Sequence, residues 1–92
     1  MIVGSLRVRL LVREARSLKD KRQVVQSIKD RLKGGFNVSV AEVDALENRR
    51  LVVLGLAMVS NEAHHVKMEL GQIVEALRVH PVAELLDHRL EV

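Results

Sequence analysis

The chain has no cysteine, tryptophan or tyrosine, and it has one proline and one phenylalanine. Without cysteine there is no disulfide framework, no thiolate nucleophile and no cysteine-based zinc site. With one aromatic residue, the chain lacks the aromatic set on which single-stranded nucleic acids stack their bases. No apolar run approaches the roughly 20 residues of a membrane-spanning helix, and the first residues lack the pattern of a signal peptide. We therefore expect a cytoplasmic protein that does not associate with membranes.

The length and charge of the chain point to one small domain with an uneven charge distribution. Ninety-two residues, 48% of them hydrophobic, are enough for one core, so we expect a single domain over residues 1–92. The net charge is +3. The first 33 residues contain ten basic and three acidic side chains, whereas the rest contains five basic and nine acidic ones. This excess of positive charge favours a polyanionic partner for the first third.

Four segments have the hydrophobic pattern of strands. Apolar and polar residues alternate over 6–12, 36–44 and 86–92, as in strands with one buried face. Residues 51–59 are apolar at both parities, which predicts a central strand whose second face is also partly covered.

Two further segments have the pattern of helices. Apolar residues at helical spacing predict a first helix over 18–33. Ser17 and Asp20 resemble a capping box at its start. We expect Gly34–Gly35 to end this helix through a left-handed glycine.

The second helix is predicted over residues 63–77, with Ser60–Asn61 as capping candidates. Gly71 lies inside this helix, where glycine is unfavourable, and indicates close packing against a neighbour. The resulting order βαββαβ predicts a ferredoxin-like α+β fold. We expect a four-stranded antiparallel sheet in the order 4-1-3-2, with both helices on one face.

Three strings of the sequence resemble a known family. They are SLKDKR at 17–22, FNVSVAEVD at 36–44 and GLAMVSN at 55–61, the last followed by His65-Val66. In this order and spacing they resemble the YlxP-like family of small bacterial proteins. The resemblance implies a ferredoxin-like fold and no established activity. Family members are often encoded near ribosome-maturation and translation-initiation genes, which implies an association with RNA or the ribosome.

The most informative segment surrounds the start of the first helix, where five cations precede or enter the helix. Cations there oppose the positive end of the helix dipole, and an anion docked on the free N–H groups would explain them. Two further lysines continue one flank of the helix. Asp20 and Asp30 offer the alternative of a partly neutralised, solvated face. The candidate anion-binding or nucleic-acid-binding residues are Arg13, Arg16, Lys19, Lys21, Arg22, Lys29 and Lys33.

Other constellations point less clearly to chemistry. Acylphosphatases are also small, basic and ferredoxin-like, but their phosphate loop is rich in glycine, whereas the loop here, residues 13–17, has none. Glu62, His65 and Glu69 share a helical face that could offer ligands to a metal ion. We expect instead a solvated face with a His65–Glu69 pair. No catalytic residue, cofactor or metal is predicted.

The hypothesis from sequence is a non-enzymatic module that binds phosphate-rich surfaces of structured RNA or the ribosome. The alternative is a structural or scaffolding homo-oligomer, most simply a dimer, assembled through the open face of the sheet. Leu11 and Met58 are the predicted interface residues of that alternative, because both are apolar residues assigned to the open face.

Overall fold

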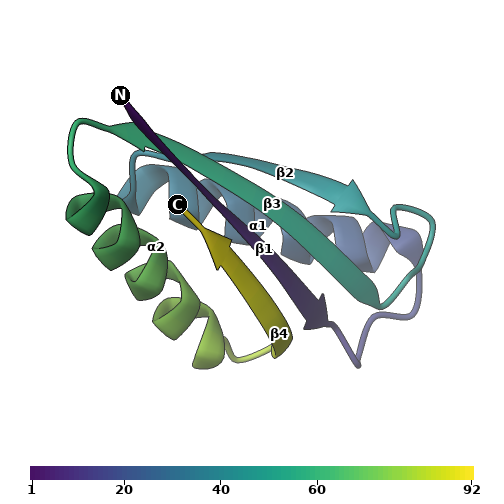
Figure 1. Cartoon of the computed structure of the whole chain (residues 1–92). Coiled ribbons are helices and arrows are strands. Elements are labelled where there is room, and N and C mark those ends of the chain that lie inside the picture. Colours follow the sequence, from purple (N-terminus) through teal and green to yellow (C-terminus); the bar gives the residue numbers. More distant parts are fainter.

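A computed structural model covers all 92 residues and contains the expected four strands and two helices (Figure 1). Their bounds are β1 Ile2–Leu11, α1 Leu18–Gly35, β2 Ser39–Asp44, β3 Leu51–Ser60, α2 Ala63–Arg78 and β4 Glu84–Glu91. In Figure 1, α1 lies behind β2 and β3, while α2 lies beside β4. Neither helix combines the length and the apolar character of a membrane-spanning segment.

The strands form one antiparallel sheet in the order β2-β3-β1-β4, which is the predicted order read from the opposite edge. β1 and β3 lie in the centre and pair over their whole length, from Ile2 opposite Ser60 to Leu11 opposite Leu51. β2 and β4 are shorter edge strands, and each contains an irregularity in its register. The structure thus confirms the ferredoxin-like α+β fold.

The core lies between one face of the sheet and the two helices. Leu6, Val8 and Leu10 of β1 are buried on this face, while the residues between them lie on the open face. The apolar stripes of the helices complete the core, as their spacing predicts. These stripes are Val25, Ile28 and Leu32 of α1, and Val66, Leu70, Ile73, Val74 and Leu77 of α2.

Helix α1 begins as predicted but ends later. The hydroxyl of Ser17 accepts a hydrogen bond from the backbone N–H of Asp20 at 3.1 Å, which confirms the cap. The helix continues through Gly34–Gly35, and no glycine of the chain has a positive φ. The predicted left-handed glycine is therefore wrong. The helix ends at the extended residue Phe36, whose side chain packs against the core.

Two predictions for α2 are also wrong. Neither capping candidate bonds to its first turn: Glu62 is the N-cap residue without a side-chain bond, and the hydroxyl of Ser60 accepts from the Glu62 N–H. Gly71 faces open space. The close approach occurs instead at Gly4 of β1, where a Cβ atom would overlap Val66 of α2.

The two predicted interface residues lie on opposite faces of the sheet. Met58 is 4% exposed and belongs to the core, so its assignment to the open face is wrong. The error arose because β3 is apolar at both parities, and parity alone could not tell its two faces apart. Met58 pairs with Gly4, a residue that faces α2. Leu11 is half-buried and shares the parity of the arginines on the open face.

Candidate nucleic-acid interface

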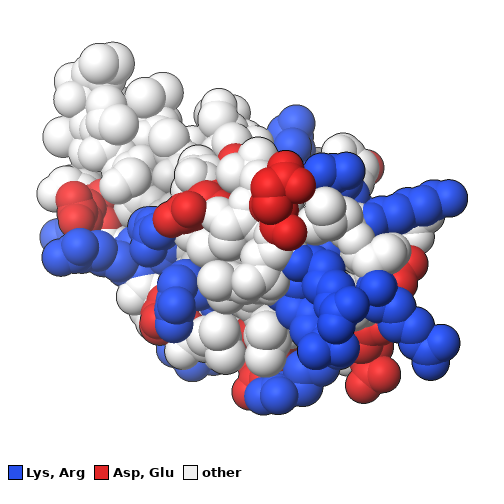
Figure 2. Space-filling view, turned by 90° about the vertical axis from the view of Figure 1, so that its right-hand side faces the viewer, with Lys and Arg blue, Asp and Glu red and all other residues white.

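Two connections of the chain meet at one end of the molecule, where β1 leads into α1 and β2 leads into β3 (Figure 1). The backbone N–H of Val12 donates to the carbonyl of Arg50 at 2.8 Å. The Nε of Arg50 donates to the carbonyl of Ala15 at 3.4 Å. Arg49 and Arg50 therefore lie beside the predicted basic segment. Figure 2 looks onto this end and shows Lys and Arg side chains over much of it, with acidic side chains scattered among them.

Eight cations lie on α1 and these two connections and form no ion pair. Arg31 lines a cavity beside His80 and is set apart from the others, which leaves seven. Six are exposed and Lys29 is half-buried. Lys19 and Lys33 lie on one flank of α1, fourteen residues or about 21 Å apart along its axis. We call this set the basic surface; it comprises Arg16, Lys19, Arg22, Lys29, Lys33, Arg49 and Arg50.

Two of the predicted cations are engaged elsewhere. Arg13 forms an exposed ion pair with Glu84 of β4 at 2.7 Å. Lys21 has no solvent-exposed surface, and its Nζ lies 2.8 Å from the carboxylate of Glu42. The prediction that Lys21 binds an external anion is therefore wrong, because its ammonium group faces the protein interior.

The start of α1 differs from the anion site that the sequence indicated. The N–H of Asp20 donates to Ser17, and the carboxylate of Asp20 accepts from the N–H of Arg16 at 3.0 Å. This carboxylate places a negative charge beside the helix start, which reduces the need for an external anion there. Binding of phosphate in this region therefore rests on the side chains of the basic surface.

Arg49 and Arg50 were missed by the sequence analysis because they follow the basic segment by about thirty residues. Their proximity to α1 depends on the pairing of β2 with β3 and on the contacts of Val12 and Ala15. The adjacent pair of arginines between two predicted strands was the one local signal that could have drawn attention to them.

The open face of the sheet presents its charges in pairs. Arg9 bonds Asp87 at 2.9 Å, and the other two pairs, Arg7 with Asp44 and Arg89 with Glu91, are 3.4 Å long. In the sheet, Arg7 lies opposite Arg89 and Arg9 lies opposite Asp87 of β4. The face thus combines three basic and three acidic side chains without excess charge.

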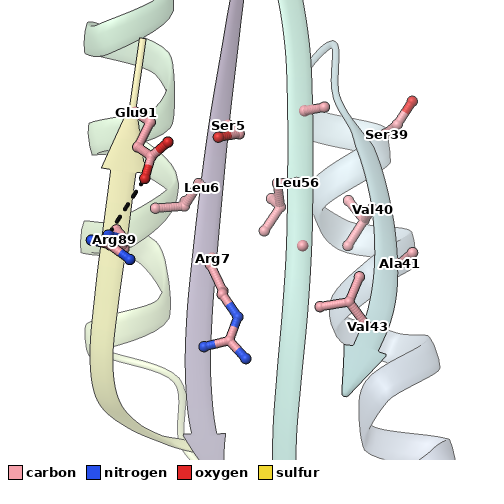
Figure 3. A pocket seen from close by; sticks show the side chains of 12 residues that line it. Ser5, Leu6, Arg7, Ser39, Val40, Ala41, Val43, Leu56, Arg89 and Glu91 are labelled. Atoms are coloured by element: carbon pink, nitrogen blue, oxygen red, sulfur yellow. Dashed lines mark ion pairs between the residues drawn. The ribbon is translucent and has the colours of Figure 1, made fainter.

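A shallow groove of about 530 Å³ crosses this face (Figure 3). Its lining includes small residues, among them Ala41, Gly55 and Ala57. Arg7 stands on β1 between the Arg89–Glu91 pair on β4 and Val43 on β2 (Figure 3). No aromatic side chain lines the groove. The face therefore lacks the stacking platform with which many sheets bind single strands.

Nearly the whole chain is similar to a known protein family. Residues 3–90 match the model of a family described as "Protein of unknown function (DUF503)". The chain belongs to this family. It is also similar to the "Uncharacterized protein YlxP" of Bacillus subtilis strain 168, with 28% identity over 90 residues that cover 98% of both chains. The resemblance expected from the three strings is thus confirmed.

The matched range, residues 3–90, includes the whole basic surface. It also includes the ion pairs of the open face, with the exception of Glu91. On α2, His65 lies 3.3 Å from Glu69, as predicted. The structure contains no group of three or more His, Cys, Asp or Glu side chains arranged to hold a metal ion.

His80 is a titratable group that the sequence did not single out. It lies in the connection between α2 and β4, and its Nδ1 accepts from the N–H groups of Val82 and Ala83, both at 3.2 Å. Burial, and secondarily the charge of Arg31, lower the pKa of His80 below 6.5. The ring therefore favours the neutral state, in which Nδ1 can accept these bonds.

Proposed function

We propose that this protein is a non-enzymatic module that binds the phosphate groups of structured RNA, free or within the ribosome, through the basic surface. The observation that carries the proposal is the contrast in pairing. The three arginines on the open face of the sheet each have an acidic partner, whereas the seven cations of the basic surface have none. Unpaired, exposed cations on one surface are the feature that binds a phosphate backbone.

Structured RNA fits this surface better than a single strand does. Single strands are bound mainly by stacking of bases on aromatic side chains. Phe36 is the one aromatic residue, and it packs against the core. Lysines and arginines spread over about 21 Å of α1 can instead contact several phosphates of a folded RNA.

An enzymatic role has less support. The connection after β1 has no glycine and is held by backbone bonds to Val12 and Arg50, so it does not form the glycine-rich cradle of an acylphosphatase. No histidine or carboxylate side chain forms a hydrogen bond to a serine hydroxyl as a general base would, and the chain has no threonine.

The test is the binding of an RNA hairpin across a salt series. We expect affinity to fall as salt rises, because each phosphate contact releases counterions. Replacing Lys19 and Arg22 by Glu should lower the affinity at least about tenfold and reduce the slope of log K against log salt by about two.

The matched control is the replacement of Lys67 and Arg78 of α2 by Glu, which changes the net charge by the same amount. This variant should bind nearly as the wild type does. Salt-independent binding, no binding, or equal losses in the two variants would each contradict the proposal.

A second candidate function is a homodimer formed through the open face. It is favoured by the balanced charges of this face and by the exposed side chains of Val3, Val43 and Val59. Equal numbers of opposite charges suit a second copy better than a polyanion. Sedimentation should then give twice the mass of one chain, and Leu11→Lys should give monomers. A monomeric wild type rules this candidate out.

A further inference from the structure

Lys21 is the only buried charged residue of the chain, although it lies in the most basic segment. Its Nζ donates to the carbonyls of Ala45 at 2.9 Å and Leu51 at 3.1 Å, with Leu46 at 3.4 Å. The carboxylate of Glu42 lies 2.8 Å from the same atom. An ammonium group has three donors, so these partners satisfy it completely. A buried charge is tolerated only with such partners.

The acceptors lie on both sides of the connection between β2 and β3. Ala45 and Leu46 precede Arg49 and Arg50, and Leu51 follows them. Ala45 also has a φ of 55°, a left-handed conformation that is unfavourable for a residue with a side chain. The bond from Lys21 thus contributes to holding this segment in a conformation that it would not readily adopt alone.

We infer that Lys21 is a positioning residue of the basic surface. By binding both ends of residues 45–51, it holds Arg49 and Arg50 against the start of α1, where they join Arg16 and Lys19. This inference rests on the proposed function, because it assigns Lys21 a role in the same RNA-binding surface. It replaces the direct anion contact that the sequence predicted for Lys21.

The first experiment compares the salt dependence of binding to an RNA hairpin. Lys21→Met keeps a long apolar side chain and removes the charge. If Arg49 and Arg50 lose their positions, the slope of log K against log salt should fall by about two, as in the double variant Arg49→Gln, Arg50→Gln. Adding Lys21→Met to that double variant should leave the slope unchanged, because the same contacts are already absent.

Ile28→Ala is the control for a loss of stability alone. Ile28 lies in the buried stripe of α1. The side-chain hydrogen bonds from α1 to residues 45–51 come from Lys21, not from Ile28. At temperatures where it is folded, this variant should keep the wild-type slope. A wild-type slope in Lys21→Met, or a reduced slope in Ile28→Ala, would overturn the inference.

A second variant covers the case in which Lys21→Met does not fold. Replacing Lys21 by Met and Glu42 by Leu together removes both charges, and such replacements are often tolerated where a single one is not. The carbonyls of Ala45 and Leu51 still lose their donor, so the same reduction in slope is expected. A wild-type slope in this variant also overturns the inference.

Hydrogen exchange separates a failure of this inference from a failure of the proposed function. The N–H of Asn48 bonds to the carbonyl of Ala45 at 3.0 Å within the connection. Without Lys21, exchange of this amide should become at least about tenfold faster, while amides of α2 change little. Unchanged exchange overturns the positioning role even if RNA binds. Faster exchange in a protein that binds no RNA overturns the proposed function, and with it the role of Lys21 in an RNA surface.

Discussion

The two sides of the sheet differ in how they hold charge. On the open side, Arg9 and Asp87 pair across neighbouring strands and remain 41% and 57% exposed. On the helix side, Lys21 and Glu42 also pair across elements, but they are 0% and 14% exposed. The outer surface of α1 carries cations with no partner at all. Basic and acidic side chains therefore pair in the interior on the helix side and neutralise each other on the open side. The outer surface of α1 keeps its positive charge available for a polyanion.

This difference teaches that charge counts along the sequence do not locate a binding surface. The first third of the chain has the largest excess of basic residues. Three of these, Arg7, Arg9 and Arg13, form exposed ion pairs with acids that follow much later in the chain. What favours phosphate binding is the set of cations left over after pairing.

We expect the largest difference between the two sides in the free energy of unfolding, when the acidic partner of Lys21 or of Arg9 is removed. Glu42→Leu leaves the ammonium of Lys21 buried without its anionic partner, and we expect a loss of about 3 kcal/mol. Asp87→Leu leaves Arg9 in contact with water, and we expect a change below about 1 kcal/mol. Urea denaturation of both variants measures the difference. Equal losses would show that burial does not distinguish the two pairs.

The sequence predicted the fold well because periodicity is a local signal. The position of a residue along a strand or helix determines the face on which its side chain lies. The alternation in β1 and the apolar stripe in α1 could therefore be recognised from the spacing of apolar residues alone. The position of Lys21 was also visible in principle. It lies four residues before Val25 and seven before Ile28, on the buried stripe. Its partners, Glu42 and the carbonyls of 45–51, could not be read from spacing.

The second expected effect concerns packing on the two sides of the sheet. At Gly4, on the helix side, a Cβ would overlap Val66, which is fully buried. We expect Gly4→Ala to lower the free energy of unfolding by about 1–3 kcal/mol. At Gly55, on the open side, a Cβ would lie 2.9 Å from Val43, which is 51% exposed and can rotate away.

Gly55→Ala should therefore cost less than about 1 kcal/mol, because alanine also reduces the freedom of the unfolded chain. Thermal denaturation of both variants under one set of conditions provides the measurement. If Gly55→Ala costs as much as Gly4→Ala, then the open face is packed as tightly as the helix side, and its description as open is wrong.

These glycines also show where sequence reasoning stops. Gly71 attracted attention because glycine is unfavourable inside a helix, yet a Cβ there would meet nothing. Gly4 lies in a strand near the amino terminus, and only the approach of α2 explains it. The error for Met58 has the same origin. Both faces of β3 are apolar, so the face that the helices cover depends on the register with β1.

The smallest expected effect tests whether the unpaired cations influence the helix side as well. Arg31 of α1 has no ion pair, and it lines the same cavity as His80. Burial first and Arg31 second hold the pKa of His80 below 6.5. As pH falls through 6.5, the unfolded state takes up the proton before the folded state does, so stability decreases. The decrease stops once pH lies below the folded-state pKa.

His80→Asn keeps an acceptor for the N–H groups of Val82 and Ala83 but cannot titrate in this range. We expect this variant to lose the decrease in stability below pH 6.5, while His88→Asn, at an exposed position of β4, keeps it.

Arg31→Gln should move the pKa of His80 part of the way back toward 6.5, measured by NMR titration of the ring protons. An unchanged titration would mean that solvent screens Arg31 completely. The charges of the unpaired cations on α1 would then have no effect on the helix side of the sheet. Their difference from the paired arginines of the open face would matter only for ligands that contact them directly.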